Sequence, residues 1–148
     1  MYIPILVDLF LRDLTKLEAE ISLYNDEKKL WKVGGSITNS AGNLTLHICG
    51  NLQHFIGALI GKSGYERNRD LEFSAKDVPR GDLLMELAKT KAIVESTLKN
   101  MHDEDLSQIF PVQKAGKEMN TAYMLSHLYG HLQYHLGQIN YHRRLLGE

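Results

Sequence analysis

The sequence has a single cysteine, Cys49, and no long hydrophobic run. One cysteine excludes an internal disulfide and a zinc site built from several cysteines, and it suits a reducing compartment. Every apolar stretch is interrupted well before the roughly 20 residues that a membrane-spanning helix needs. The N-terminal segment has no basic start and no cleavage site of small residues, so we expect no signal peptide and a cytoplasmic protein.

An excess of one charge is also lacking, because the formal net charge is −1 and acidic and basic residues are mixed along the chain. This balance gives no electrostatic reason to expect nucleic acid or an anionic membrane as a partner. Signals for β-hairpins are missing too, since no Asn-Gly or Asp-Gly pair occurs and two-residue alternation is weak. At 148 residues the chain fits one domain, which we expect to span residues 1–148.

Four long segments instead carry the apolar period of a helix, with polar or glycine-rich links between them. The links include a charged segment, residues 64–77, and a loop with Pro111 and Gly116. Helices of about 20 residues are each about 30 Å long, so this inventory predicts an all-α protein, a four-helix bundle. The predicted helices run from about Ile3 to Leu23, Asn43 to Lys62, Pro79 to Asn100 and Asn120 to Leu146.

Histidine is abundant, with seven in the chain, and the last predicted helix carries His127, His131, His135 and His142. Side chains four residues apart on a helix have Cβ atoms about 5–6 Å apart, so two such imidazoles can chelate one ion. The spacing allows His127 with His131 or His131 with His135. His47, on or beside the apolar stripe of the second helix, is the best-placed third ligand. Three neutral nitrogens and an open coordination position suit zinc, nickel or iron(II).

A lone inward histidine is more often a hydrogen-bonded core residue than a metal ligand. A pair favours a metal, because burying two imidazoles without a shared partner is costly. Asn51, His54, Tyr123 and His127 are further candidates to line the pocket of such a site. For Tyr123, as for Trp31, packing between helices is the simpler interpretation.

Two other residues are expected to lie outside the ligand set. Cys49 is two positions from His47, about 200° around the helix. It should therefore point elsewhere and behave as a small buried hydrophobe. His142 is seven residues beyond His135, too far along the helix to share the same ion.

Three segments resemble one group of proteins. The segment HLQYHLGQI, His131 to Ile139, is similar to the paired histidines followed by Gly-Gln in the DinB-like superfamily, four-helix metalloproteins that include the YfiT-type enzymes. LTLHICGN, in which Gly50 and Asn51 follow His47, resembles the H-x-x-G-N of a smaller branch, the DUF1572 family. ERNRDLEF, residues 66–73, is similar to the Arg-x-Arg-Asp-x-Glu-Phe run of that branch. The resemblance covers nearly the whole chain and implies the metal ligands His47, His131 and His135.

Characterised members of the superfamily are thiol-dependent transferases and isomerases that use bacillithiol, mycothiol or glutathione. The resemblance therefore implies one divalent ion, a homodimer, and activation of a small thiol that attacks an electrophile. Arg67 and Arg69 would then hold a carboxylate of the thiol by bidentate contacts. The preferred alternative is a surface lattice of salt bridges between these arginines and Glu66, Asp70 and Glu72.

Two other functions remain open from the sequence. A metal-dependent hydrolase would use the same ion to acidify water, but it usually needs a nearby carboxylate as general base. Neither metal-bearing helix offers an inward carboxylate, so this function ranks lower. A non-catalytic, dimeric protein that binds a metal or a small ligand is the third interpretation.

Overall fold

The computed structural model describes residues 2–112, 116 and 118–147. Throughout these residues the regular secondary structure is helical, apart from two isolated β-bridges, Gly34 with Ile37 and Ile109 with Asn120. The expected all-α class is therefore confirmed. Residues 113–115 and 117 of the predicted loop lie outside the described part of the chain.

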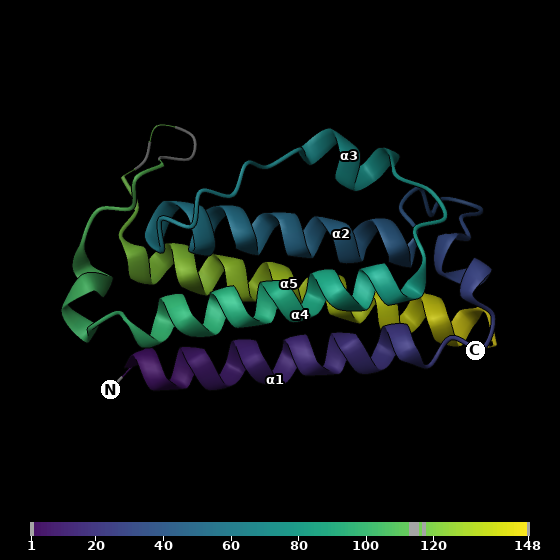
Figure 1. Ribbon diagram of the computed structural model, residues 1–148, viewed down its shortest axis with the longest axis horizontal. Coiled ribbons are helices and arrows are strands. Elements are labelled where there is room, and N and C mark those ends of the chain that lie inside the picture. Colours follow the sequence, from purple (N-terminus) through teal and green to yellow (C-terminus); the bar gives the residue numbers. More distant parts are fainter. Residues whose placement is uncertain (1, 113–115, 117, 148) are drawn as a thin grey trace.

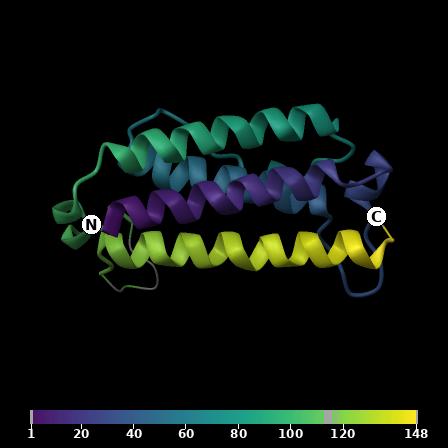
Figure 2. The same ribbon diagram turned by 90° about the horizontal axis from the view of Figure 1, so that it is seen from below.

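Four long helices dominate the described chain and agree closely with the predicted segments. They are α1 (Tyr2–Ser22), α2 (Ala41–Leu52), α4 (Arg80–Lys99) and α5 (Thr121–Leu145). All four lie side by side along the long axis of the molecule (Figure 1). Helices α1 and α2 each contact both α4 and α5, so α1 and α2 occupy opposite corners of the arrangement (Figure 2).

The apolar stripes predicted from the sequence meet in one core. The apolar side chains that recur at helical spacing on one face of α1, α4 and α5 are buried, as are Leu44 and Ile48 of α2. Phe55 and Leu59, farther along the second predicted helix, are only partly buried and pack against the core from its edge. The two helices that carry the histidines both begin at a side-chain cap, since Ser40 accepts a hydrogen bond from the Asn43 N–H and Asn120 accepts one from the Tyr123 N–H.

The second predicted helix changes type partway along. After Leu52 the chain continues as a π-helix, Gln53–Ile60, and the Gly61 N–H donates to the carbonyl of Ile56. A Cβ atom at Gly57 would meet Ile93 of α4 at 2.7 Å, so the absence of a side chain lets this segment approach α4 closely. The chain is therefore helical from Ala41 to Ile60, close to the expected span of Asn43 to Lys62, but its second half is a π-helix and not an α-helix. π-helices are rare and have no single-residue signal.

The charged link between α2 and α4 contains the short helix α3 (Arg69–Ser74). Asn68 caps this helix, because its Oδ1 accepts a hydrogen bond from the Leu71 N–H. Glu72 was expected in a surface lattice of salt bridges, but its side chain is buried. Helix α3 lies on the outer side of α2 (Figure 1), so it covers part of that helix from solvent.

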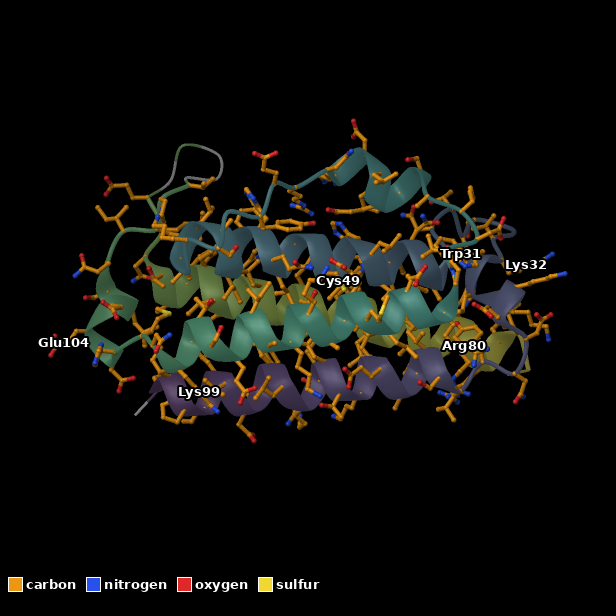
Figure 3. All side chains as sticks on the ribbon, in the orientation of Figure 1. Trp31, Lys32, Cys49, Arg80, Lys99 and Glu104 are labelled. Carbon is orange, nitrogen blue, oxygen red and sulfur yellow. The ribbon has the colours of Figure 1, made fainter. Side chains whose placement is uncertain are left out.

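The lone cysteine is inside the molecule. Cys49 lies between the helices, whereas Arg80 and Lys99 mark the two ends of α4 (Figure 3). Burial raises the pKa of the Cys49 thiol to about 12, despite a hydrogen bond with Thr90, so the thiol is inert, as expected. Among the described helices, none is both long and apolar enough to cross a membrane.

Trp31 and Tyr123, both expected to pack between helices, differ in their burial. Trp31 is buried, and its indole lies against the α2 backbone at Gly42, where a Cβ atom would come within 2.7 Å of the ring. Tyr123 is 62% exposed on α5, so its expected packing between helices was wrong. The glycine-rich loop that follows Trp31 has no periodic pattern, so the contact between Trp31 and the start of α2 was not predicted.

Candidate metal centre

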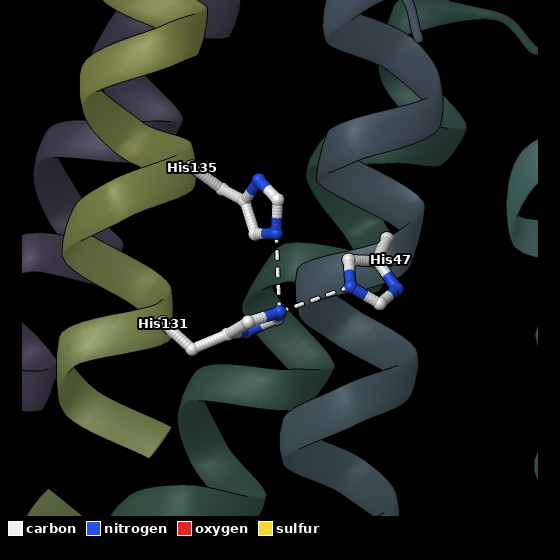
Figure 4. A group of neighbouring side chains, drawn as sticks. All are labelled: His47, His131 and His135. Carbon is white, nitrogen blue, oxygen red and sulfur yellow. Dashed lines mark hydrogen bonds between the residues drawn. The ribbon is translucent and has the colours of Figure 1, made fainter. Parts of the chain in front are cut away.

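Three histidines from two helices converge between α2 and α5 (Figure 4). His47 Nε2 lies 3.0 Å from His131 Nε2, and His135 Nε2 lies 3.1 Å from the same atom. One ligand atom from each of the three residues lies within 4.8 Å of the others. The structure thus brings together the three residues that the resemblance had singled out, with His47 buried and His131 and His135 partly buried.

Neighbouring side chains fix the orientation of two of these rings. His47 Nδ1 donates a hydrogen bond to Glu72 Oε1 at 2.9 Å. His135 Nδ1 donates to Gln138 Oε1 at 2.6 Å. Because each Nδ1 carries the proton, each Nε2 of these two rings presents a bare lone pair to the centre of the cluster.

The three Nε2 atoms fit a cation better than a shared proton. The Nε2 atoms of His47 and His135 both face His131 Nε2, and a single proton on that atom can be donated to only one of them. One cation between the three nitrogens would be attracted by all three lone pairs. Ligands bound at about 2.0–2.1 Å in tetrahedral or octahedral geometry stand roughly 2.8–3.4 Å apart, which agrees with the two nitrogen–nitrogen distances.

The carboxylate behind His47 comes from α3. Glu72 is 5% exposed and receives two hydrogen bonds from Arg67, Nε to Oε2 at 2.8 Å and an Nη to Oε1 at 2.9 Å. Burial alone would raise the pKa of Glu72, but the hydrogen bonds from His47 and Arg67 outweigh it and lower that pKa below its ordinary value. Glu72 is therefore an anion that holds the His47 ring, as carboxylates commonly do behind metal-bound histidines.

Two further residues of the segment 66–73 pack beside His47, Phe73 directly and Arg69 against Phe73. The Phe73 ring packs against the His47 ring, with centroids 4.7 Å apart, and the Arg69 guanidinium lies 5.1 Å from the Phe73 centroid. The predicted surface lattice was therefore wrong for Arg67 and Glu72, whose ion pair is buried. Arg67 is also committed within the protein, so it is not free to hold a carboxylate of a substrate.

Gly50 explains part of the H-x-x-G-N motif. A Cβ atom built there would lie 2.0 Å from Glu72 Oε2 and 2.6 Å from its Cδ. Only glycine leaves room for the carboxylate to reach His47 across α2. The amide of Asn43, one turn before His47, donates to the backbone carbonyls of Glu72 and Ala75 and so fastens α3 to α2.

The four other residues predicted to line a pocket differ in their exposure. Asn51 is buried one turn after His47, and its Oδ1 has no hydrogen-bond partner in the described residues. His54 is partly buried, with its ring edge against Phe55, and burial together with Arg67 lowers its pKa. Tyr123 and His127 are exposed on α5. None of these four lines the cavity that reaches His135.

His142 is buried but has a different role, as expected. The Tyr24 hydroxyl donates to His142 Nδ1 at 2.6 Å, and His142 Nε2 donates to the carbonyl of Lys32 at 2.8 Å. These bonds tie the end of α5 to the segment that follows α1. Both ring nitrogens are used in this way, so His142 is not a fourth ligand.

The residues missed by the sequence analysis are Glu72 as a buried anion, Gln138 and Asn43. The i, i+3 spacing of His135 and Gln138 on one helix could have indicated their contact. Glu72 and Asn43 belong to different elements, and no local spacing indicates that they meet.

The fold and the cluster together define an all-helical protein with a three-histidine site between two of its long helices. The model of a family described as "Protein of unknown function (DUF1572)" matches residues 2–148, so the chain belongs to the DUF1572 family. A comparison with curated proteins finds no match.

Proposed function

We propose that the protein is a four-helix metalloprotein of the DinB-like type that binds one divalent ion, zinc, nickel or iron, through His47, His131 and His135. We further propose that it is a transferase that joins a low-molecular-weight thiol, of the bacillithiol, mycothiol or glutathione type, to an electrophile. The observation that carries the proposal is the convergence of three Nε2 atoms whose tautomers are set by Glu72 and Gln138.

The donor set supports a reactive site more than a structural one. Structural zinc sites use four protein ligands, whereas sites with three protein ligands keep a position for water or substrate. A divalent ion there would supply Lewis acidity, which lowers the pKa of a bound thiol or water. The three imidazoles act as ligands and not as bases, because a nitrogen that coordinates a metal cannot also accept a proton.

The hydrolase remains the weaker alternative. A carboxylate does approach the site, but it comes from α3 and not from either of the helices that carry the histidines. Both oxygens of Glu72 already accept hydrogen bonds from Arg67, and one also accepts from His47. A carboxylate held in this way and kept ionised by its partners is poorly suited to accept a proton from water. A non-catalytic metal-binding protein is the second alternative.

A conjugation assay separates these functions. Untagged protein loaded with zinc, nickel or iron(II) is mixed with monochlorobimane and with glutathione, bacillithiol or mycothiol in turn. The transferase predicts conjugation that stops when the metal is chelated and is lost in His135→Ala. The matched control is His127→Ala, an exposed histidine two turns away on the same helix, which should conjugate normally. Metal binding without conjugation of any thiol would favour the non-catalytic binder.

We also propose that the protein forms a homodimer. Support comes from the resemblance to the DinB-like superfamily, which implies a homodimer. Large apolar side chains that are more than half exposed and lie outside the cavity beside His135, such as Ile5, Met85 and Tyr123, are available for burial against another chain. Sedimentation equilibrium tests the proposal, because a mass of twice 16.8 kDa is expected and a mass of one chain would contradict it.

A further inference from the structure

A cavity of about 730 Å³ opens beside the histidine cluster. Residues 36–39, in the loop before α2, form one wall together with Leu44, and the second half of α5 forms the other. Its size lies within the roughly 300–1,000 Å³ of small-molecule sites. His135 belongs both to the cavity wall and to the cluster, so a molecule bound in the cavity lies next to the proposed metal ligands.

The wall of this cavity carries no formal charge. Among the described residues that line it, none is an aspartate, glutamate, lysine or arginine. Aliphatic side chains come from Ile37, Leu44 and Leu145, and phenol rings come from Tyr134 and Tyr141. A ligand that brought an ionised carboxylate into this space would lose hydration without gaining a cationic side chain from the wall, which is costly.

A glycine in the middle of α5 widens the same space. Gly137 lies in the cavity wall, and a Cβ atom built there would meet no other atom within 4 Å. Glycine inside a helix is less favourable than alanine, so packing within the chain does not account for it. The missing side chain leaves room between Tyr134 and Tyr141, which lie on the same face of the helix about one turn on either side.

Uncharged polar side chains also line the cavity: Ser36, Thr38, Asn39, Gln138 and His142. Gln138 lines the cavity, and its Oε1 accepts the hydrogen bond from His135, so its amide N–H groups are what it can offer a ligand. His142 also lines the cavity but uses both ring nitrogens within the chain. The wall can therefore recognise a hydrogen-bond acceptor near His135 and an apolar body farther out.

We infer that this cavity binds an uncharged small molecule with an apolar, preferably aromatic, body and one hydrogen-bond acceptor atom directed toward the side-chain amide of Gln138. If the proposed function holds, this molecule is the electrophile and not the thiol, since biological thiols of the proposed type carry carboxylates. Its carbon would form the new bond to sulfur, while the thiol proton and the leaving group pass to solvent.

The test uses a pair of probes that differ by one carboxylate, 4-phenylimidazole and 4-(1H-imidazol-4-yl)benzoate. Their dissociation constants are measured by calorimetry at pH 8 with metal-free and zinc-loaded protein. We expect the neutral probe to bind both forms, and the anionic probe to bind at least about 10-fold more weakly. Gly137→Leu should raise the dissociation constant of the neutral probe by at least about 10-fold, because the new side chain fills the cavity.

Gly130→Leu is the matched control. Gly130 is also exposed on α5 with open space around a built Cβ atom, but it does not line the cavity. This variant should bind the neutral probe as the natural protein does, and circular dichroism and zinc content should be unchanged in both variants. Equal binding of the two probes, or undiminished binding to Gly137→Leu, would overturn the inference.

The inference and the proposed function can fail separately. If the protein takes up no metal but the neutral probe still binds the metal-free form and is lost in Gly137→Leu, the cavity inference stands and the metal proposal falls. If zinc binds with normal stoichiometry but the neutral probe binds neither form, the cavity inference falls and the metal proposal stands.

Discussion

At the scale of single residues, the cluster depends on side chains that never touch the proposed ion. Glu72 holds His47 from behind, and Gln138 holds His135 in the same way. Partners of this kind fix the tautomer and the orientation of a ligand and raise its basicity. The ligands are therefore only part of the site, and substitutions behind them should affect metal affinity.

Replacing Glu72 by glutamine tests this directly. Glu72→Gln keeps the size of the side chain but removes the charge that holds His47 Nδ1–H and Arg67. We expect the affinity for zinc to fall by about 10- to 100-fold. Competition with a chromophoric chelator measures the change, and Glu66→Gln, an exposed glutamate in the same link, is the control. Unchanged affinity in Glu72→Gln would show that the carboxylate does not support the ligand.

A methyl group at position 50 should have a related effect. In Gly50→Ala the new Cβ would lie 2.0 Å from Glu72 Oε2, so the carboxylate must move and its contact with His47 is weakened. We expect zinc affinity to fall while the helix content measured by circular dichroism is retained. Gly81→Ala on α4, where a Cβ atom meets nothing, should leave zinc affinity unchanged. Equal affinities in the two variants would contradict the account.

At the scale of elements, sequence periodicity predicted the long helices well and the short ones poorly. The stripe on α1, for example, is buried as its spacing of three and four predicts. Helix α3 has six residues and is held by its cap and by Asn43, which is distant in sequence, so apolar periodicity carried no signal for it. The burial of Glu72 depends on the attachment of α3 to α2 through Asn43, so the sequence of the charged link alone could not predict it.

The attachment of α3 gives a prediction of its own. Asn43→Ala removes two hydrogen bonds and leaves the carbonyls of Glu72 and Ala75 without their donor, which costs about 1–3 kcal/mol for buried groups. We expect faster amide hydrogen exchange across residues 69–75 and weaker zinc binding. Asn140→Ala, which removes a contact between α5 and Glu20 of α1, is the control and should leave zinc binding intact. Unchanged exchange in α3 would mean that Asn43 does not hold it.

At the scale of the whole molecule, a buried carboxylate links α1 to α5. Asp13 accepts hydrogen bonds from Arg12, Tyr129 and Gln133. Burial alone would raise its pKa, but the hydrogen bonds from Arg12, Tyr129 and Lys16 outweigh it and lower the pKa of Asp13 to about 2. A lowered pKa in the folded state stabilises the fold fully above about pH 4, and this stabilisation is lost as the pH falls through about 2.

Urea unfolding of the natural protein and of Asp13→Asn at several pH values tests this link. We expect a difference in free energy of unfolding on the order of 1–2 kcal/mol at pH 6, reduced because solvent screens the half-exposed Arg12 and Lys16. The difference should shrink as the pH is lowered from about 4 to 2. A difference that does not change with pH would show that the charge of Asp13 does not contribute.

On the same scale, helix spacing alone left two histidine pairs open, and the resemblance chose between them. The structure brings His135, and not His127, to His131 and His47. The choice depends on how α5 is rotated against α2, which a period within one helix cannot determine. The cavity beside His135 was equally hidden, because its walls come from a loop and a helix about 100 residues apart.

The most direct test of the central claim is the metal content of untagged protein, measured by elemental analysis beside a variant with both His131→Ala and His135→Ala. We predict close to one equivalent of a divalent metal in the natural protein and almost none in the double variant, with helix content by circular dichroism unchanged. A natural protein without metal after exposure to zinc, nickel and iron(II), or a double variant that keeps its metal, would contradict the account.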